Sequence, residues 1–308
     1  MDTLKIRTIY FKHKEIIPKI NWTMAGYSRA AYRTGFYIPD LDLCLDAGPP
    51  IVQYPKDIMI THTHGDHIAS LPFTMIGDFG KKNFYNVYVP EEAEQHIEVY
   101  ILSLFVANWM VPHTSIPTKD WYKIHAMKEG LKFRKEFNKQ PIEVEIFKCY
   151  HRIPTVGYGL SLIKTKLKTE YYGFPGKKLA EMKKDGIDIT EEIIIPQLVY
   201  LCDTTCKVFD NLEIFKYKVI MIECSFYEEP DLKHAKEKKH VHWLNLRRFV
   251  QSYPDCHFIL FHFSQRHKDA DIHQFFNQEM KTYNLKNLKI WLPPITDSEL
   301  LGNRNSIP

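Results

Sequence analysis

The chain has 308 residues, of which 44% are hydrophobic and 25% are charged, and its formal net charge is +4. It is long and apolar enough to bury a large core, so collagen-like, low-complexity and intrinsically disordered classes are excluded. The mild positive charge neither requires nor excludes a nucleic-acid partner, since binding depends on where Lys and Arg gather.

The first residues, MDTLKIRTIYFKHKE, have neither the apolar core of a secretory signal nor the Arg/Ser-rich character of a transit peptide. The longest apolar segment, residues 99–111, is too short to span a bilayer and predicts a buried helix. Six cysteines without a CxxC pair lie mostly in apolar runs, which is typical of reduced thiols. We therefore expect a cytoplasmic protein with no membrane partner.

Short apolar runs with β-forming residues recur along the chain and predict buried strands. They occupy residues 57–61, 143–147, 157–163, 197–203, 218–225, 257–262 and 288–292. Segments with helical apolar spacing follow Val241 and Asp269, and this alternation indicates an α/β fold. Residues 165–192 are rich in Gly and Lys and predict a mobile connection, not a second core. One domain over residues 1–308 is therefore expected.

The segment MITHTHGDHIASLP places four polar side chains directly after a strand that ends at Thr61. Imidazole and carboxylate groups are common zinc ligands, and a tight turn after a strand can direct several of them into one cavity. Gly65 permits such a turn. We interpret His62, His64, Asp66 and His67 as metal ligands, the alternative being a polar surface loop.

Three more candidates stand at the ends of later apolar runs: His151 in CYHRIP, Asp203 in YLCDTT and His262 in LFHFSQ. Ligands that converge from several strand ends are a usual way for an α/β scaffold to build a site. A single buried His is more often a core residue, but the three together favour metal ligation.

The HxHxDH sequence after a strand resembles the signature of the metallo-β-lactamase superfamily. The resemblance implies an αββα sandwich of two mixed β-sheets flanked by helices. It also implies two Zn²⁺ ions per chain, one on His62, His64 and His151, the other on Asp66, His67 and His262, with Asp203 bridging them. Two such ions, about 3.5–4 Å apart, can share a hydroxide and drive hydrolysis. Mn²⁺ or Fe²⁺ suits the same ligands.

Within the superfamily, HRIPTVGYGL and LFHFSQRH resemble the HS/RxPSxGY and HFSxRY segments of the ribonuclease Z family. This implies a phosphodiesterase that cuts RNA, with precursor tRNA as partner and 3′-end processing as activity; homodimers occur in that family. It also implies that Ser264 and Arg266, which flank the last ligand, contact substrate.

Glu223 and His240 have the order of the family's HEAT and HST motifs, and the resemblance assigns them, with Asp66, to catalysis. A carboxylate behind an imidazole supports its cationic form, so His240 can protonate a departing ribose oxygen. His242 competes for this role. Lys238 and Lys239 belong to a basic run that would attract phosphates, although such runs are commonly solvated helix faces.

The chain departs from the ribonuclease Z pattern in several places. LCLDAGPP keeps only Asp46 and Gly48 of the first motif, IECS replaces HEAT, and HVH replaces HST. A long tRNA-gripping arm is not evident, since residues 165–192 are too few. Two other functions therefore stay open: a hydrolase that opens β-lactams or cleaves another ester or thioester, and a non-catalytic nucleic-acid platform. Asp203 argues against a dedicated β-lactamase.

Overall fold

The computed structural model describes residues 9–51, 53–76, 84–116 and 120–292. Two seven-stranded sheets dominate these residues. The first sheet has the order β1 (Lys14–Ile16), β2 (Thr23–Arg29), β3 (Arg33–Ile38), β4 (Leu43–Leu45), β5 (Asp57–Met59), β6 (Tyr85–Pro90) and β7 (Tyr122–Met127). The second has the order β14 (Leu288–Ile290), β13 (His257–Phe261), β12 (Val219–Glu223), β11 (Thr190–Leu201), β10 (Val156–Leu167), β9 (Gln140–Lys148) and β8 (Lys132–Phe137).

Both sheets are mixed. In the first, β1 to β4 pair antiparallel and β4 to β7 pair parallel. In the second, β8 to β11 pair antiparallel and β11 to β14 pair parallel. Because parallel strands need covered faces on both sides, helices are expected outside each sheet.

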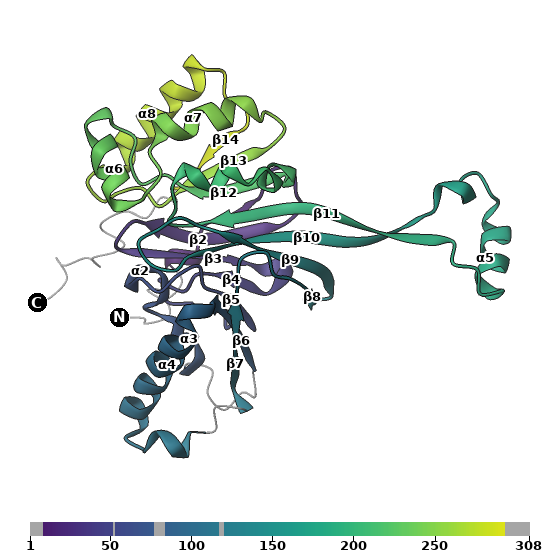
Figure 1. The fold of residues 1–308 in the computed structure, drawn as a ribbon, viewed down its shortest axis with the longest axis horizontal. Coiled ribbons are helices and arrows are strands. Elements are labelled where there is room, and N and C mark those ends of the chain that lie inside the picture. Colours follow the sequence, from purple (N-terminus) through teal and green to yellow (C-terminus); the bar gives the residue numbers. More distant parts are fainter. Residues whose placement is uncertain (1–8, 52, 77–83, 117–119, 293–308) are drawn as a thin grey trace, which may run out of the picture.

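Helices lie on the outer face of each sheet (Figure 1). On the first sheet these are α2 (Gly65–Ile68), α3 (Leu71–Ile76) and α4 (Glu94–Trp109), and on the second α6 (Leu232–Lys238), α7 (Trp243–Ser252) and α8 (Asp269–Thr282). The described residues also form short 3-10 helices: η1 (Ile9–Phe11), η2 (Pro39–Leu41), η3 (Glu91–Ala93), η4 (His113–Ser115), η6 (Thr169–Tyr171), η7 (Cys206–Asp210), η8 (Leu212–Lys216) and η9 (Glu229–Asp231).

Strand periodicity divides the core into layers. Met59 belongs to the core between the sheets, with Phe36, Tyr158 and Phe261, whereas its neighbour Ile58 packs toward α3 and α4. A third cluster packs the second sheet against α7 and α8. The predicted αββα sandwich is confirmed.

The predicted helix in residues 99–111 exists as α4, but it is only partly buried. Ile97, Ile101 and Phe105 are buried, whereas Val99 and Met110 are 62% and 88% exposed. None of the helices in the described ranges is long and apolar enough to cross a membrane. All six cysteines are free thiols.

The prediction of a mobile connection at residues 165–192 was wrong. β10 and β11 stay paired out to Leu167 and Thr190, and α5 (Gly176–Lys184) follows at the tip. The segment, which we call the arm, projects far from the sandwich (Figure 1). An exposed ribbon without a core beneath it has no apolar alternation, so its sequence looks like a loop.

Candidate metal centre

The seven predicted ligand side chains come together at one edge of the sandwich. His62 and His64 follow β5, Asp66 and His67 lie in α2, and His151 lies between β9 and β10. Asp203 follows β11 and His262 follows β13. Strands fix the directions of these side chains, because the strand ends that carry them meet at this edge.

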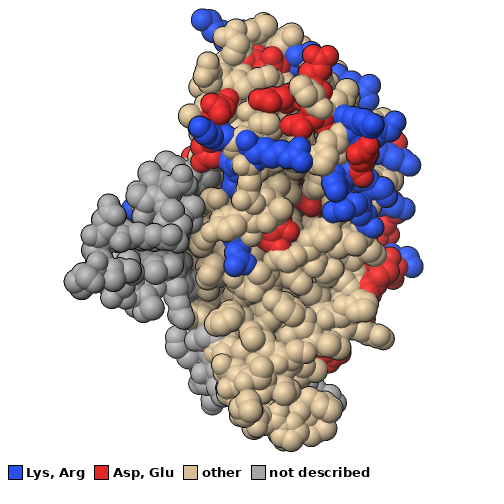
Figure 2. Space-filling model, turned by 90° about the vertical axis from the view of Figure 1, so that its left-hand side faces the viewer, with Lys and Arg blue, Asp and Glu red and all other residues tan. Residues whose placement is uncertain are grey.

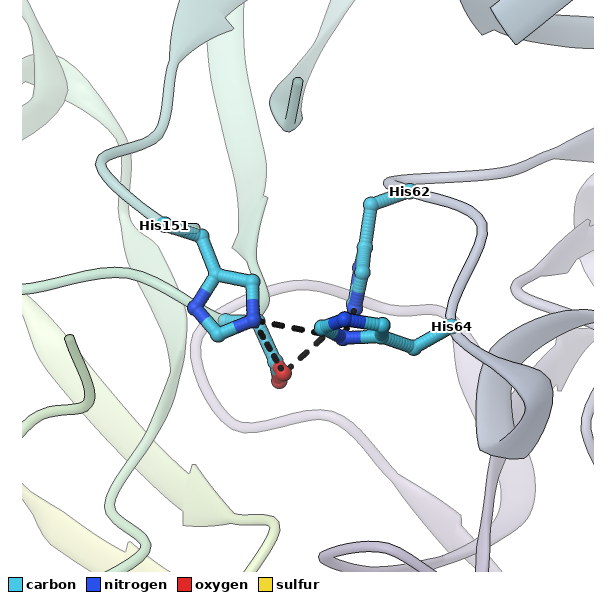
Figure 3. A group of neighbouring side chains, drawn as sticks. His62, His64 and His151 are labelled. Carbon is cyan, nitrogen blue, oxygen red and sulfur yellow. Dashed lines mark hydrogen bonds and ion pairs between the residues drawn. The ribbon is translucent and has the colours of Figure 1, made fainter. Parts of the chain in front are cut away.

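Four ligand atoms form a first group. His64 Nδ1 is 3.1 Å from His62 Nε2 and 3.3 Å from His151 Nε2. Asp203 Oδ2 is 3.4 Å from both His62 Nε2 and His151 Nε2. Figure 3 shows the three imidazoles directed toward a common point. Two ligands at about 2.0–2.1 Å from a tetrahedral zinc are about 3.3 Å apart, so this group has the spacing of a zinc site.

A second group uses the other oxygen of Asp203. Asp203 Oδ1 is 3.2 Å from His262 Nε2 and 3.6 Å from His67 Nε2. Asp66 Oδ2 is 3.4 Å from His67 Nε2 and 3.5 Å from His262 Nε2. One carboxylate thus faces two groups, which is the arrangement of a bridging ligand.

Both Nε2 atoms of the second group are buried and have no hydrogen-bond partner among the described residues. A buried nitrogen without a partner costs about 1–3 kcal/mol, and a bound cation would remove that cost at His67 and His262. The structure therefore fits a metal cofactor held by His and Asp side chains. Cys202 adjoins this group, but burial raises the pKa of its thiol well above the usual value.

Burial lowers the pKa of His62 to about 4, and also lowers the pKa of His64 and His151. These imidazoles are therefore neutral near pH 7 and have a lone pair to offer, as ligation requires. Burial alone would raise the pKa of Asp66 and Asp203, but the surrounding histidines lower both, so both carboxylates stay charged.

Asp46 supports His67 from behind the centre. It is fully buried and accepts hydrogen bonds from Thr61 N (2.8 Å) and Tyr200 Oη (2.8 Å), and it lies 3.0 Å from His67 Nδ1. This contact fixes a proton on Nδ1 and directs Nε2 of His67 toward the centre. Burial alone would lower the pKa of His67, but Asp46 and Asp203 raise it well above its usual value, so ligation at Nε2 would displace a proton. The sequence identifies Asp46 as a retained motif residue but does not predict its position behind His67.

Ser225 supports His262 in the same way and was missed from the sequence. Its Oγ donates to Glu223 Oε2 (2.8 Å) and is 3.1 Å from His262 Nδ1. His151 is oriented by the backbone, because its Nδ1 donates to Lys239 O at 3.2 Å. In the sequence, the role of Ser225 is indicated only by its place two residues after Glu223, the last residue of a strand.

The backbone is strained at three of these strand ends. Asp46, Asp203 and His262 have φ angles of 57°, 49° and 65°. Left-handed non-glycine residues cost about 1–3 kcal/mol each and cluster at functional sites. Gly48 meets a different constraint, since a Cβ there would lie 1.8 Å from the carbonyl oxygen of Asp66.

Glu223 and His240 form a buried pair beside the centre. Glu223 Oε1 is 2.8 Å from His240 Nδ1, and the two side chains are 0% and 13% exposed. Burial alone would lower the pKa of His240, but Glu223 raises it to about 9. Burial raises the pKa of Glu223 while His240 lowers it, and the net effect is a lowered value. His240 is therefore a cation at neutral pH.

His242 has a different environment. Its Nδ1 accepts from Leu244 N (3.1 Å) at the start of α7, and its Nε2 donates to Glu228 O (2.8 Å). Both ring nitrogens are bound to the backbone. This geometry favours His240 over His242 as the proton donor.

The predicted substrate residues differ in exposure and in their neighbours. Lys239 lines a cavity of about 710 Å³ that opens beside His151, together with Tyr150, Arg152 and Lys207. Ser264 is largely buried, and its Oγ accepts from Arg266 N at 3.3 Å. Arg266 is 57% exposed, and Lys238 is exposed on α6. In Figure 2, Lys and Arg gather over the upper part of the face, above the part almost free of charge. Contact with substrate stays a prediction for all four residues, Ser264, Arg266, Lys238 and Lys239.

Comparison with known proteins agrees with the geometry, although no family model matches the sequence. A tRNase Z of Arabidopsis thaliana is 28% identical over 259 residues, covering 82% of this chain and 88% of the relative. A chloroplastic tRNase Z of the same plant is 25% identical over 269 residues, covering 82% and 71%. A metallo-β-lactamase fold protein of Bacillus subtilis superposes with a TM-score of 0.56 at 16% identity, covering 86% of this chain and 93% of that one.

Proposed function

We propose that this chain, a ribonuclease Z-like member of the metallo-β-lactamase superfamily, is an endoribonuclease that removes the 3′ trailer from precursor tRNA. The observation that carries the proposal is the position of a cationic His240 beside paired His/Asp groups that share Asp203. The similarity to tRNases Z supports the choice of substrate.

The cofactor we propose is a pair of Zn²⁺ ions, which Mn²⁺ or Fe²⁺ could replace. His62, His64 and His151 would hold one ion, Asp66, His67 and His262 the other, and Asp203 both. When bound, the ions would supply Lewis acidity toward a phosphodiester and would lower the pKa of water, so that hydroxide is available as the nucleophile.

The chain's own residues orient the reactants. Asp66 accepts a hydrogen bond from Ala31 N at 2.9 Å, and its charged carboxylate can accept another from the attacking water. The raised pKa of His240 keeps its imidazole protonated, and the contact of Nδ1 with Glu223 leaves Nε2 to face the substrate. His240 Nε2 then gives its proton to the departing 3′ oxygen.

Basic groups are available to hold the RNA backbone. Lys239 and Arg152 line the cavity beside His151, and α5 at the arm tip carries Lys177, Lys178, Lys183 and Lys184 with one acidic residue, Glu181. Such groups attract phosphates without reading sequence. A tRNA lying between the arm and the centre would contact both. A homodimer and a cytoplasmic location stay predictions.

The test is cleavage of a precursor tRNA, with sequencing of the ends, beside single-stranded DNA and unstructured RNA of equal length. We expect one cut just after the acceptor stem, and His240→Ala should lose most of the rate while keeping its metal. His113→Ala, an exposed site, is the matched control. Equal cleavage of all three substrates would refute tRNA processing, and turnover of a chromogenic cephalosporin without RNA cleavage would favour the lactam alternative.

A further inference from the structure

A second cluster of ligand-type side chains lies outside the paired centre. It consists of Glu228, Asp231 and His267, whose ligand atoms all lie within 4.8 Å of one another. Glu228 follows β12 in the segment that begins with Glu223, and His267 follows β13 in the segment that begins with His262. The two segments are neighbours, because β12 and β13 pair in parallel. We call these three residues the His267 cluster.

His267 is the residue that points to a ligand. It is 8% exposed, and its Nε2 has no hydrogen-bond partner among the described residues. Asp231 Oδ2 lies only 3.3 Å from this Nε2, yet the geometry is not that of a hydrogen bond. The distance equals the separation of about 3.3 Å between two ligands of a tetrahedral zinc, as in the paired centre.

The surroundings hold His267 in place and leave the cluster negative. Arg29 donates to the carbonyl oxygens of Ser264 and His267, which fixes the loop after β13. Arg266 Nη1 lies 3.3 Å from Asp231 Oδ1, so it leaves Oδ2 available. Glu228 has a side chain 53% exposed, and its Oε1 lies 3.7 Å from His267 Nδ1, so its carboxylate would have to turn toward the Nε2 side to join Asp231.

A second buried polar atom lacks a partner at the same place. Tyr227 is 2% exposed, its ring lies 4.4 Å from that of His267, and its hydroxyl forms no hydrogen bond with the described residues. The two partnerless polar atoms belong to neighbouring side chains, and a bound ion or water would supply the partners that they lack.

We propose that Glu228, Asp231 and His267 bind one divalent transition-metal ion, with Zn²⁺ as the first choice. One imidazole, two carboxylates and water make a ligand set that zinc accepts. The ribonuclease Z segment HFSxRY has Tyr where this chain has His267, so the resemblance does not imply this ligand.

The ion would connect the loop after β13 to η9. From η9 the chain continues through α6 to Lys239 and His240. The ion would therefore stabilise the position of the segment that ends at His240. The role we assign is structural: His267 touches no reacting group and acts by fixing the start of α6.

The test counts zinc ions per chain by equilibrium dialysis at rising free Zn²⁺, followed by mass spectrometry, for wild type, His267→Tyr and Asp231→Asn. His273→Tyr, on the exposed side of α8, is the matched control. We expect both cluster variants to bind one ion fewer than wild type and the control to equal wild type. Zinc should also raise the Tm of wild type more than that of the cluster variants.

Equal numbers of ions in wild type and in folded cluster variants, judged by circular dichroism, would overturn the proposal. If His267→Tyr does not fold, the number of zinc ions bound by the isosteric variant Asp231→Asn tests the proposal. The result is independent of the paired centre, because a His62→Ala variant should retain the ion of the His267 cluster. Loss of the cluster ion and failure of the proposed function are therefore distinguishable.

Discussion

Replacing Glu223 by glutamine should keep the size of the side chain that faces His240 but remove its negative charge. In wild type, Glu223 raises the pKa of His240 from 6.5 to about 9, which corresponds to about 3 kcal/mol in favour of the imidazolium. Without that charge, we expect the pKa to return to about the ordinary value of 6.5. A general acid acts only when protonated, so the rate falls as pH rises through its pKa, and the variant should lose activity at lower pH.

The expected loss depends on pH. At about pH 8 His240 is roughly 90% protonated in wild type and roughly 3% in Glu223→Gln, so the rate should fall roughly thirtyfold, against less than twofold at about pH 6. Glutamine must also place an amide where Glu223 accepts from Ser225 N, Ser225 Oγ and Thr204 N, so lower stability is expected as well.

The assay is single-turnover cleavage of precursor tRNA between about pH 5.5 and 9.5, with metal content measured in parallel. Glu213→Gln, whose side chain is 50% exposed, serves as control. A variant profile parallel to that of wild type would refute the reasoning. If Glu223→Gln loses metal while its dependence of rate on pH is unchanged, Glu223 is instead a metal ligand.

Four further variants test other parts of the account. Asp46→Asn should weaken metal binding about 10–100-fold in a chelator competition, because the group that faces His67 Nδ1 loses its negative charge and one of its two acceptor oxygens; unchanged affinity would contradict this. Gly48→Ala should lower the free energy of unfolding in urea by about 1–3 kcal/mol, because its Cβ meets Asp66 O, and wild-type stability would refute the clash. Tyr158→Phe should cost about 1 kcal/mol with metal content unchanged, because the carbonyl oxygens of Ile60 and Tyr88 lose their donor. Changing the four lysines of α5 to alanine should raise KM for precursor tRNA and flatten its salt dependence; an unchanged KM would exclude the arm from binding.

The convergence of the seven candidate ligand side chains could be predicted because each follows a buried apolar run or lies in the turn just after one. A strand that ends in His or Asp directs that side chain toward one edge of the sheet, and Asp203 and His262 follow this rule. Local sequence carries both the strand and the ligand, so no knowledge of distant contacts is needed.

The residues behind the ligands could not be predicted in this way. The roles of Asp46 and Ser225 depend on which atoms face the imidazoles of His67 and His262, and this is a property of the packed structure. The choice between His240 and His242 likewise depends on hydrogen bonds, since His242 binds only backbone groups. Strand β1 was also beyond local patterns, because its sequence KEI holds a single apolar residue.

The most direct test of the central claim is anomalous X-ray diffraction at the zinc edge from crystals of the zinc-loaded protein. Besides a peak at the His267 cluster, we expect two peaks at the paired centre, one within bonding distance of each carboxylate oxygen of Asp203. One should lie among His62, His64 and His151, and the other among Asp66, His67 and His262. A single peak at this edge of the sandwich, or peaks that Asp203 does not touch, would contradict a dinuclear centre.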